Sequence, residues 1–328
     1  MVNNIETERM MELGYEMKPT RNGRNFYEVT SAMQNAIRKG DYEVAGYAMW
    51  ELLPEYLGYL RKRLLVISAE DCFGVITKEI LALCDIGTED AMEKALALIC
   101  LAKKNRDADY FVCNLMYNDV PIDGDKQELG KHLFTAIRQK DVVKAGHFAM
   151  ALFKKNRKYL WQLLNDMARM YYQHLESEFA ALQISNDRVS TPSTETVFAA
   201  KAICLMWTCK DPIERTLGWE KMDFDFLLNP EDIPIIKPLD ECTKIKGFFP
   251  DWAYNWHTYR GKYTLGRDAV HAIENDQRLL TPLEENLFDD CTWNRDINAC
   301  LLKHNPKHYR LPYDDGKRRP EEKYGTQE

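Results

Sequence analysis

Residues 36–46 read AIRKGDYEVAG, and residues 136–146, at an offset of 100 positions, read AIRQKDVVKAG. Aligned without gaps at the same offset, residues 29–64 and 129–164 share ten identities over 36 positions. Similarity at a fixed spacing within one chain is typical of a structural unit that is used more than once. We therefore predict that the chain is built around a tandem repeat.

The spacing of apolar residues predicts that the repeated unit is helical. In the first copy, four apolar residues recur at i, i+4, i+7 and i+8, which places them on one face of a helix. These residues are Val29, Met33, Ala36 and Ile37. Gly40 then ends this helix, and Asp41 is placed to cap the next one. We predict an all-α fold with helical-bundle units over residues 26–118 and 126–215.

The small pair Ala45-Gly46 and its equivalent Ala145-Gly146 lie inside predicted helices. Glycine inside a helix costs about 1 kcal/mol relative to alanine. A small pair allows a neighbouring helix to approach closely, which predicts tight packing within each copy.

The remaining segments differ in character. Residues 1–25 are polar, and we expect a short helix at most, followed by a loop. Residues 216–302 begin with a proline-rich and aromatic-rich stretch, which predicts an irregular wrap, and end in small C-terminal helices. Residues 303–328 form a basic tail that we expect to be partly flexible.

Composition narrows the class of protein. The formal net charge is -7, and the nine cysteines form no CxxC pair. Neither an HExxH motif nor a zinc-ligand spacing occurs, so we predict no metal site and no cofactor, with the cysteines as reduced thiols. The N-terminus lacks the apolar core of a signal peptide, and no apolar run reaches the roughly 18 residues of a membrane helix. We expect a cytoplasmic protein without a membrane segment.

Part of the first copy resembles a known family. The matching stretches are Ser31-Ala32, Ala36-Ile37-Arg38-x-x-Asp41, Ala45, Arg61-Lys62-Arg63-Leu64 and Ser68-Ala69-Glu70-Asp71-Cys72-Phe73-Gly74. Their order and spacing resemble the C-terminal helical region of the replication-associated recombination ATPases, the RarA/MgsA/Werner-interacting group, whose run reads SAF-x-KS-I-R-x-SD…AL…RR…SEDIG. Residues 97–103 are similar to that family's "A…YLALAPKS" helix. The resemblance implies a clamp-loader-like helical domain that oligomerises and acts near replication forks.

The chain also departs from that family. It has one extra residue between the acidic pair Glu70-Asp71 and Gly74, and it lacks the AAA+ module that precedes this region in the family. No GxxxxGK[ST] motif occurs, so the lysine and hydroxyl that hold ATP phosphates and Mg²⁺ are missing. We therefore expect no ATP hydrolysis. Glu70-Asp71 could be a catalytic pair, but adjacent helical carboxylates diverge, and we interpret them as first-turn acids of a helix capped by Ser68.

Two kinds of residue are candidates for nucleic-acid binding. Three basic clusters lie at predicted helix ends, where cations are favourable in any solvated helix but could together bind phosphates. Residues 252–267 interleave aromatic and basic side chains, which is typical either of base stacking or of an aromatic wrap packed on the bundle. The candidates are Arg61, Lys62, Arg63, Lys103, Lys104, Arg106, Lys154, Lys155, Arg157, Lys158, Trp252, Trp256, His257, Tyr259, Arg260, Lys262 and Arg267.

The function we expect is a non-catalytic accessory role in DNA replication or recombination. The helical scaffold would bind single-stranded or fork-like DNA, or a replication protein, and would self-associate. An alternative is a protein-interaction module, for example a virus-encoded one, that engages a host replication or defence factor. A third class, an enzyme with a His/Arg site between His257 and Arg267, has the least support because no catalytic motif accompanies those residues.

Overall fold

The computed structural model describes most of the chain between residues 18 and 266. The described residues are 18–53, 55–72, 76–102, 104, 106–112, 122–172, 175–189, 192–208, 237–255 and 258–266. They are mostly helical and contain no strand, with one isolated bridge between Cys72 and Lys104. The all-α prediction is therefore confirmed for them. The predicted C-terminal helices and the tail at 303–328 lie outside the described residues.

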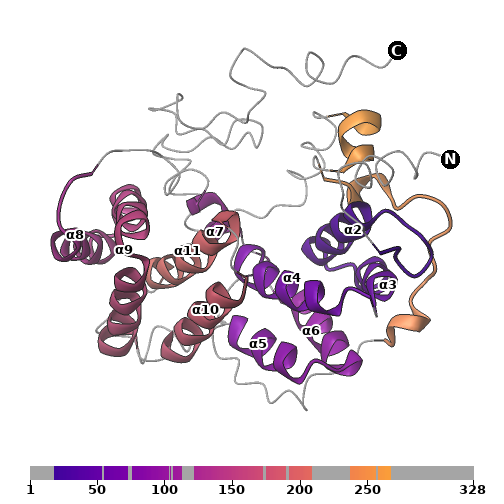
Figure 1. Ribbon diagram of the computed structural model, residues 1–328, viewed down its shortest axis with the longest axis horizontal. Coiled ribbons are helices and arrows are strands. Elements are labelled where there is room, and N and C mark those ends of the chain that lie inside the picture. The colour runs from indigo at the N-terminus through magenta and orange to yellow at the C-terminus, as the bar shows by residue number, and fades with distance from the viewer. Residues whose placement is uncertain are drawn as a thin grey trace. The chain divides into compact units, whose positions relative to one another are not determined.

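The chain divides into two compact units, which Figure 1 shows as helical bundles. The first unit comprises Met1–Ile67, Ala82–Ala102 and Leu228–Arg278, and the second comprises Ser68–Leu81, Lys103–Leu227 and Leu279–Glu328. The first unit therefore takes in a segment far from the predicted 26–118 boundaries, because residues 237–255 pack on its helices.

In the first unit, helices α2 (Phe26–Lys39), α3 (Tyr42–Leu52) and α6 (Glu89–Leu101) pack on one another. Most of α4 (Leu57–Glu70) and the end of α5 (Thr77–Ile86) complete the bundle. The face predicted for the first helix is its buried face, since Val29, Met33, Ala36 and Ile37 are fully buried.

The second unit contains α7 (Asp107–Phe111), α8 (Lys126–Arg138), α9 (Val142–Tyr171), α10 (Glu176–Val189) and α11 (Pro192–Thr208). Helix α8 packs on α9 and α11, and α9 also packs on α10 and α11. These contacts parallel those of α2 with α3 and α6 and of α3 with α6 in the first unit.

The turn that follows α2 has the same hydrogen bonds as the turn that follows α8. Gly40 and Lys140 both have left-handed backbones, with φ of 72° and 59°. Their N–H groups donate to the carbonyls of residues 37 and 137 at 3.0 and 3.1 Å. The side chains of Asp41 and Asp141 then accept from the backbone N–H three residues on, each at 3.1 Å. The predicted cap at Asp41 is therefore confirmed, and Asp141 makes the equivalent cap in the second copy, while the repeat of the whole unit stays a prediction.

Helix α9 corresponds to α3 and α4 together. Its backbone leaves helical geometry at Asn156, where φ is -159° and ψ is 85°. The side chain of Asn156 accepts a hydrogen bond from the N–H of Tyr159 at 2.9 Å, so it caps the second half of the helix. At the offset of 100 residues this break matches the gap between α3 and α4. The two residues on each side of Asn156 are exposed to solvent.

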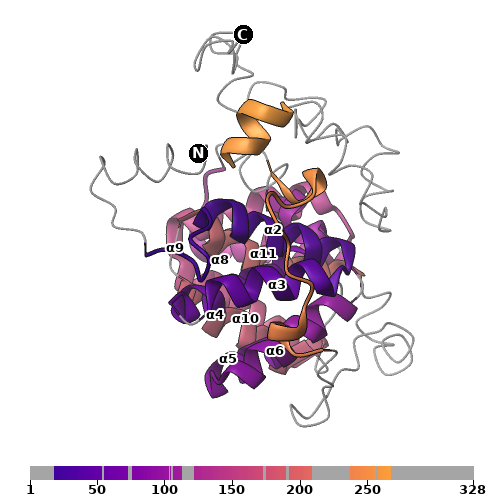
Figure 2. The same ribbon diagram turned by 90° about the vertical axis from the view of Figure 1, so that its right-hand side faces the viewer.

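The Ala45-Gly46 pair accommodates an irregular segment, and the prediction that it packs against a helix is wrong for the first unit. A Cβ atom at Gly46 would lie 2.5 Å from the Sγ of Cys242. Cys242 belongs to residues 237–255, an irregular stretch that Figure 2 shows in orange as it crosses α3 and α2. We refer to residues 237–255 as the strap.

We predict that Asp41→Ala and Asp141→Ala destabilise their units to a similar degree, by about 1 kcal/mol each. The reason is that both side chains make the same capping bond in the same turn. The two variants are compared with the wild type by urea unfolding followed by circular dichroism. A loss in one variant with none in the other would contradict the equivalence of the two turns.

Candidate nucleic-acid interface

The hairpin formed by α8 and α9 is the most basic part of the described chain. Residues 122–172 contain ten Lys and Arg against five Asp and Glu, although the whole chain carries a charge of -7. The equivalent residues 22–72 contain six against seven. The two hairpins therefore share a helical framework but differ in charge.

Four candidate cations flank the kink of α9, and all of them are exposed. They are Lys154, Lys155, Arg157 and Lys158. They lie on both sides of the non-helical backbone at Asn156. The Lys155 ammonium reaches the loop before α8 and donates to the carbonyl of Gly124.

Two further cations complete this surface, and the sequence analysis did not single them out. Lys126 lies with its ammonium 5.3 Å from the ring centre of Tyr159, beyond the kink. Lys131 is exposed on α8, near enough to Asp125 to act on it electrostatically together with Lys155. The local excess of lysine and arginine over residues 122–172 was the signal that could have identified them. We call Lys126, Lys131, Lys154, Lys155, Arg157 and Lys158 the basic patch.

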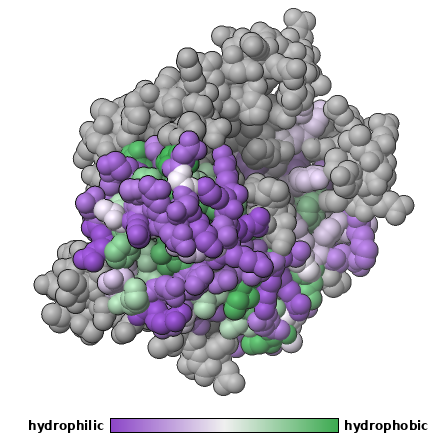
Figure 3. Space-filling view, turned by 60° about the vertical axis from the view of Figure 1, so that its left-hand side comes forward, coloured by the Kyte–Doolittle hydropathy of each residue, from purple (hydrophilic) through white to green (hydrophobic). Residues whose placement is uncertain are grey.

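Acidic side chains also lie beside the basic patch. Asp125 caps α8, and hydrogen bonds from the N–H groups of Glu128 and Gln127, with the charges of Lys155 and Lys131, keep its pKa below the ordinary value. Asp123 and Glu128 are exposed nearby in sequence. The six cations of the basic patch outnumber these three carboxylates, so the net charge of this surface is positive. Figure 3, in which the side bearing α8 and α9 comes forward, shows hydrophilic residues over much of that face.

The predicted cluster Arg61-Lys62-Arg63 is mostly engaged within the first unit. The Arg61 guanidinium lies across Gly87 and donates to its carbonyl at 3.1 Å, and a Cβ at Gly87 would lie 1.6 Å from its Nη2. Arg63 donates to the side chain of Gln34. Lys62 alone of the three is exposed. This cluster therefore presents one cation to solvent.

The cluster at residues 103–106 is also internal as far as it is described. Arg106 lies 3.4 Å from Asp71 and 4.0 Å from Glu70, with 15% of its side chain exposed. Lys104 forms the backbone bridge with Cys72, while Lys103 lies outside the described residues. The interpretation of Glu70-Asp71 as first-turn acids capped by Ser68 is wrong, because α4 ends at Glu70 and its last acids pair with Arg106.

The start of the aromatic stretch, residues 252–255, packs on α2 of the first unit, as the wrap alternative predicted for the stretch. Lys39 lies with its ammonium 4.1 Å from the ring centre of Trp252. Arg260 pairs with Asp251 at 3.0 Å, and Tyr259 lies against Tyr263 with ring centres 4.9 Å apart. Trp256, His257, Arg267 and the side chain of Lys262 lie outside the described residues.

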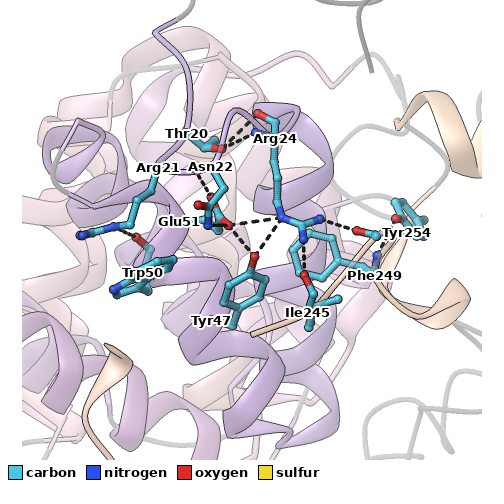
Figure 4. Close-up of polar contacts among 11 residues, drawn as sticks. Thr20, Arg21, Asn22, Arg24, Tyr47, Trp50, Glu51, Ile245, Phe249 and Tyr254 are labelled. Carbon is cyan, nitrogen blue, oxygen red and sulfur yellow. Dashed lines mark hydrogen bonds and ion pairs between the residues drawn. The ribbon is translucent and has the colours of Figure 1, made fainter. Parts of the chain in front are cut away.

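A buried polar cluster holds the start of the first unit together (Figure 4). The Glu51 side chain is fully buried and accepts hydrogen bonds from Asn22, Tyr47 and Arg24 at 2.6 to 3.3 Å. Burial alone would raise the pKa of Glu51, but these hydrogen bonds and the charge of Arg24 outweigh it and lower the pKa. The carboxylate is therefore stabilised in its charged form.

A metal-binding role and a membrane-spanning role gain no support from the described residues. Within them, no group of three His, Cys, Asp or Glu side chains could hold a metal ion. Among the described helices, none is long and apolar enough to cross a membrane. Comparison with protein-family models, curated proteins and solved structures finds no match. What remains is an all-α protein whose second unit carries the basic patch.

We predict that Glu51→Gln lowers the free energy of unfolding at pH 7 by about 1–3 kcal/mol, because Arg24 loses its charged partner in a buried site. The pKa of Glu51 is lower in the folded state than in the unfolded chain, where it is about 4.3. The stabilisation is therefore complete above that value and disappears as pH falls through the folded pKa. The difference between variant and wild type should narrow below about pH 4.

The matched control for this substitution is Glu55→Gln. Glu55 makes an exposed ion pair with Lys18, which contributes about 0–1 kcal/mol at most. Both variants are followed by chemical unfolding between pH 3 and pH 8. Equal effects of the two substitutions, or a gap that widens in acid, would contradict the assigned role of Glu51.

Proposed function

We propose that this chain is a non-catalytic accessory protein of DNA replication or recombination, which binds DNA through the basic patch on α8 and α9. The observation that carries the proposal is the contrast between the two hairpins. The cations around the kink of α9 are exposed together. In the first unit, Arg61 and Arg63 of the cluster before the end of α4 are only partly exposed and lie against Gly87 and Gln34.

The physics of DNA binding fits a local patch on an acidic chain. A net charge of -7 repels DNA at long range, but at 0.1 M salt this repulsion is screened beyond about 10 Å. Contacts at short range then depend on the cations that face the phosphates. The basic patch supplies six of them from two neighbouring helices, which is enough to contact several successive phosphates.

The aromatic rings beside the basic patch support phosphate contacts more than base stacking. Arg157 lies 5.0 Å from the ring centre of Phe153, and Lys126 lies over Tyr159. His132 stacks on Phe148, with ring centres 5.1 Å apart. These rings are already in contact with a cation or another ring. We therefore propose that the patch binds the sugar-phosphate backbone, in single-stranded, forked or duplex DNA alike.

The assignment to replication or recombination rests on the family resemblance of the first copy. That resemblance implies a scaffold near replication forks and self-association, and we expect no ATP hydrolysis because the phosphate-binding motif is missing. A protein partner is the second candidate, favoured by large apolar side chains left exposed at two helix ends of the first unit. Ile86, the last residue of α5, is 55% exposed, and Leu101, the last residue of α6, is 65% exposed.

We predict weak, steeply salt-dependent DNA binding that Lys154→Glu/Lys155→Glu greatly reduces. Neutralising three or four phosphates gives a log–log salt slope of about 3–4 on duplex and about 2–3 on single strands. Each lysine removed from a phosphate contact lowers the slope by about 1. Fluorescence anisotropy with labelled single-stranded and duplex oligonucleotides, between about 25 and 200 mM salt, measures both quantities, because the Debye length falls from about 20 Å to about 7 Å over this range.

The matched control is Lys62→Glu/Lys246→Glu, which changes the net charge equally at exposed lysines of the first unit. This variant and Trp252→Ala should bind DNA like the wild type. An equal loss of DNA binding in the control would mean that the total charge of the chain, rather than the basic patch, governs binding. An absence of binding at 25 mM salt, where electrostatic attraction is strongest, would reject the DNA proposal and favour a protein partner.

A further inference from the structure

The strap is bound to the first unit as an extended peptide is bound in a groove. Its only regular structure is two short 3₁₀ turns, η4 (Leu239–Glu241) and η5 (Asp251–Ala253). It lies against α3 through η4 and against α2 through η5. The residues it contacts lie about two hundred positions earlier in the chain, as with Arg24 and Gly247. The groove and its occupant are therefore separate segments of the sequence.

Side chains of the groove form hydrogen bonds with main-chain groups along much of the strap. Glu93 accepts from the N–H of Leu239 at 3.1 Å, and Glu43 accepts from the N–H of Thr243 at 2.8 Å. The Arg24 guanidinium donates to two strap carbonyls, those of Ile245 and Gly247.

Further main-chain contacts occur at both ends of the strap. The Tyr42 hydroxyl donates to the carbonyl of Lys237 at 2.8 Å. The Ser31 hydroxyl donates to the carbonyl of Ala253 at 2.9 Å and accepts from the N–H of Asn255 at 2.8 Å. Hydrogen bonds to the main chain hold a segment in place without selecting its side chains, as in other modes of peptide recognition.

Buried side chains of the strap add selectivity. Five of them are at most 3% exposed: Leu239, Cys242, Phe249, Ala253 and Tyr254. Cys242 occupies the space above Gly46, where no larger groove residue could stand. Phe249 packs against Tyr47, with ring centres 6.0 Å apart. The groove thus requires apolar or small residues at fixed positions of an extended segment.

Part of the groove is held by contacts among residues outside the strap. The Nε of Arg24 is held by Tyr47 at 3.1 Å and by Glu51 at 3.3 Å, which aims its terminal nitrogens at the strap (Figure 4). Glu51 in turn accepts hydrogen bonds from Asn22, Tyr47 and Arg24, which all precede the strap by about two hundred residues. A groove that is organised in advance loses little free energy on binding.

We infer that this groove is a peptide-binding site and that its partner segment can be supplied by a second copy of the chain. Every copy carries both the groove and the strap, so exchange between two copies needs no new contacts. The strap releases no helix or strand when it leaves, because it contains only two 3₁₀ turns. Self-association by strap exchange follows from these contacts, independently of DNA binding.

Complementary variants test this inference. Gly46→Leu/Glu43→Lys blocks the groove, since a Cβ at Gly46 meets Cys242 at 2.5 Å, and leaves the strap intact. Leu239→Asp/Phe249→Asp places charges at two buried positions of the strap and leaves the groove residues unchanged. Size-exclusion chromatography with light scattering should find each variant monomeric alone and a heterodimer in the mixture. A mixture that stays monomeric, while both variants keep the wild-type circular dichroism spectrum, would overturn the inference.

A labelled synthetic peptide of residues 237–255 provides the second measurement. It should bind the strap variant, and a scrambled peptide and the groove variant should each bind at least about tenfold more weakly. If the strap variant fails to fold, the peptide is offered to the wild-type chain, where slow exchange with the resident strap should incorporate it. No peptide binding in either chain overturns the inference. No nucleic acid is present, so the outcome is separate from that of the DNA proposal.

Discussion

The left-handed turn closed by an aspartate cap is the constraint on which both hairpins depend. After α2 and again after α8, one residue with positive φ ends the helix, and the next residue caps the following helix. A positive φ normally favours glycine, which the first copy has at Gly40, whereas the second copy places Lys140 there. The turn survives this change because its hydrogen bonds are the same in both copies.

On this common framework the two units differ in what their second helix offers. In the first unit, α3 bears Gly46 and Glu43, which receive the strap. In the second unit, the equivalent helix continues through a kink and exposes cations on both sides of it. One hairpin is therefore suited to bind a segment of polypeptide, and the other is suited to bind polyanions. The two proposals follow from this difference in side chains on similar backbones.

Local sequence patterns were sufficient to predict the helices but insufficient to predict which cations are available. The period of Val29, Met33, Ala36 and Ile37 predicts the buried face of α2, and Asp41 marks the cap, because these signals act within a few residues. Arg61 and Arg63 look as basic in the sequence as Lys154 and Lys155. Their difference depends on Gly87 and Gln34, which lie more than twenty residues away along the chain.

Long-range contacts also fix where the start of the aromatic segment lies. The sequence left base stacking and a structural wrap as open alternatives for residues 252–267. Trp252 packs beside Lys39, and Ala253 bonds to Ser31, contacts that no local pattern near residue 252 could reveal. The same holds for Arg106, which pairs with Asp71 although the two residues are far apart in the sequence. This pairing explains the acidic pair Glu70-Asp71, which resembled the start of a helix.

Photo-crosslinking to DNA with mass-spectrometric mapping tests the central claim most directly. The wild-type chain is crosslinked at low salt to a single-stranded and a duplex oligonucleotide that carry a photoreactive group on the phosphate backbone. We predict that crosslinked peptides fall within residues 122–172, around the kink at Asn156. Crosslinks confined to residues 18–102 or to the strap, with none on α8 or α9, would contradict it.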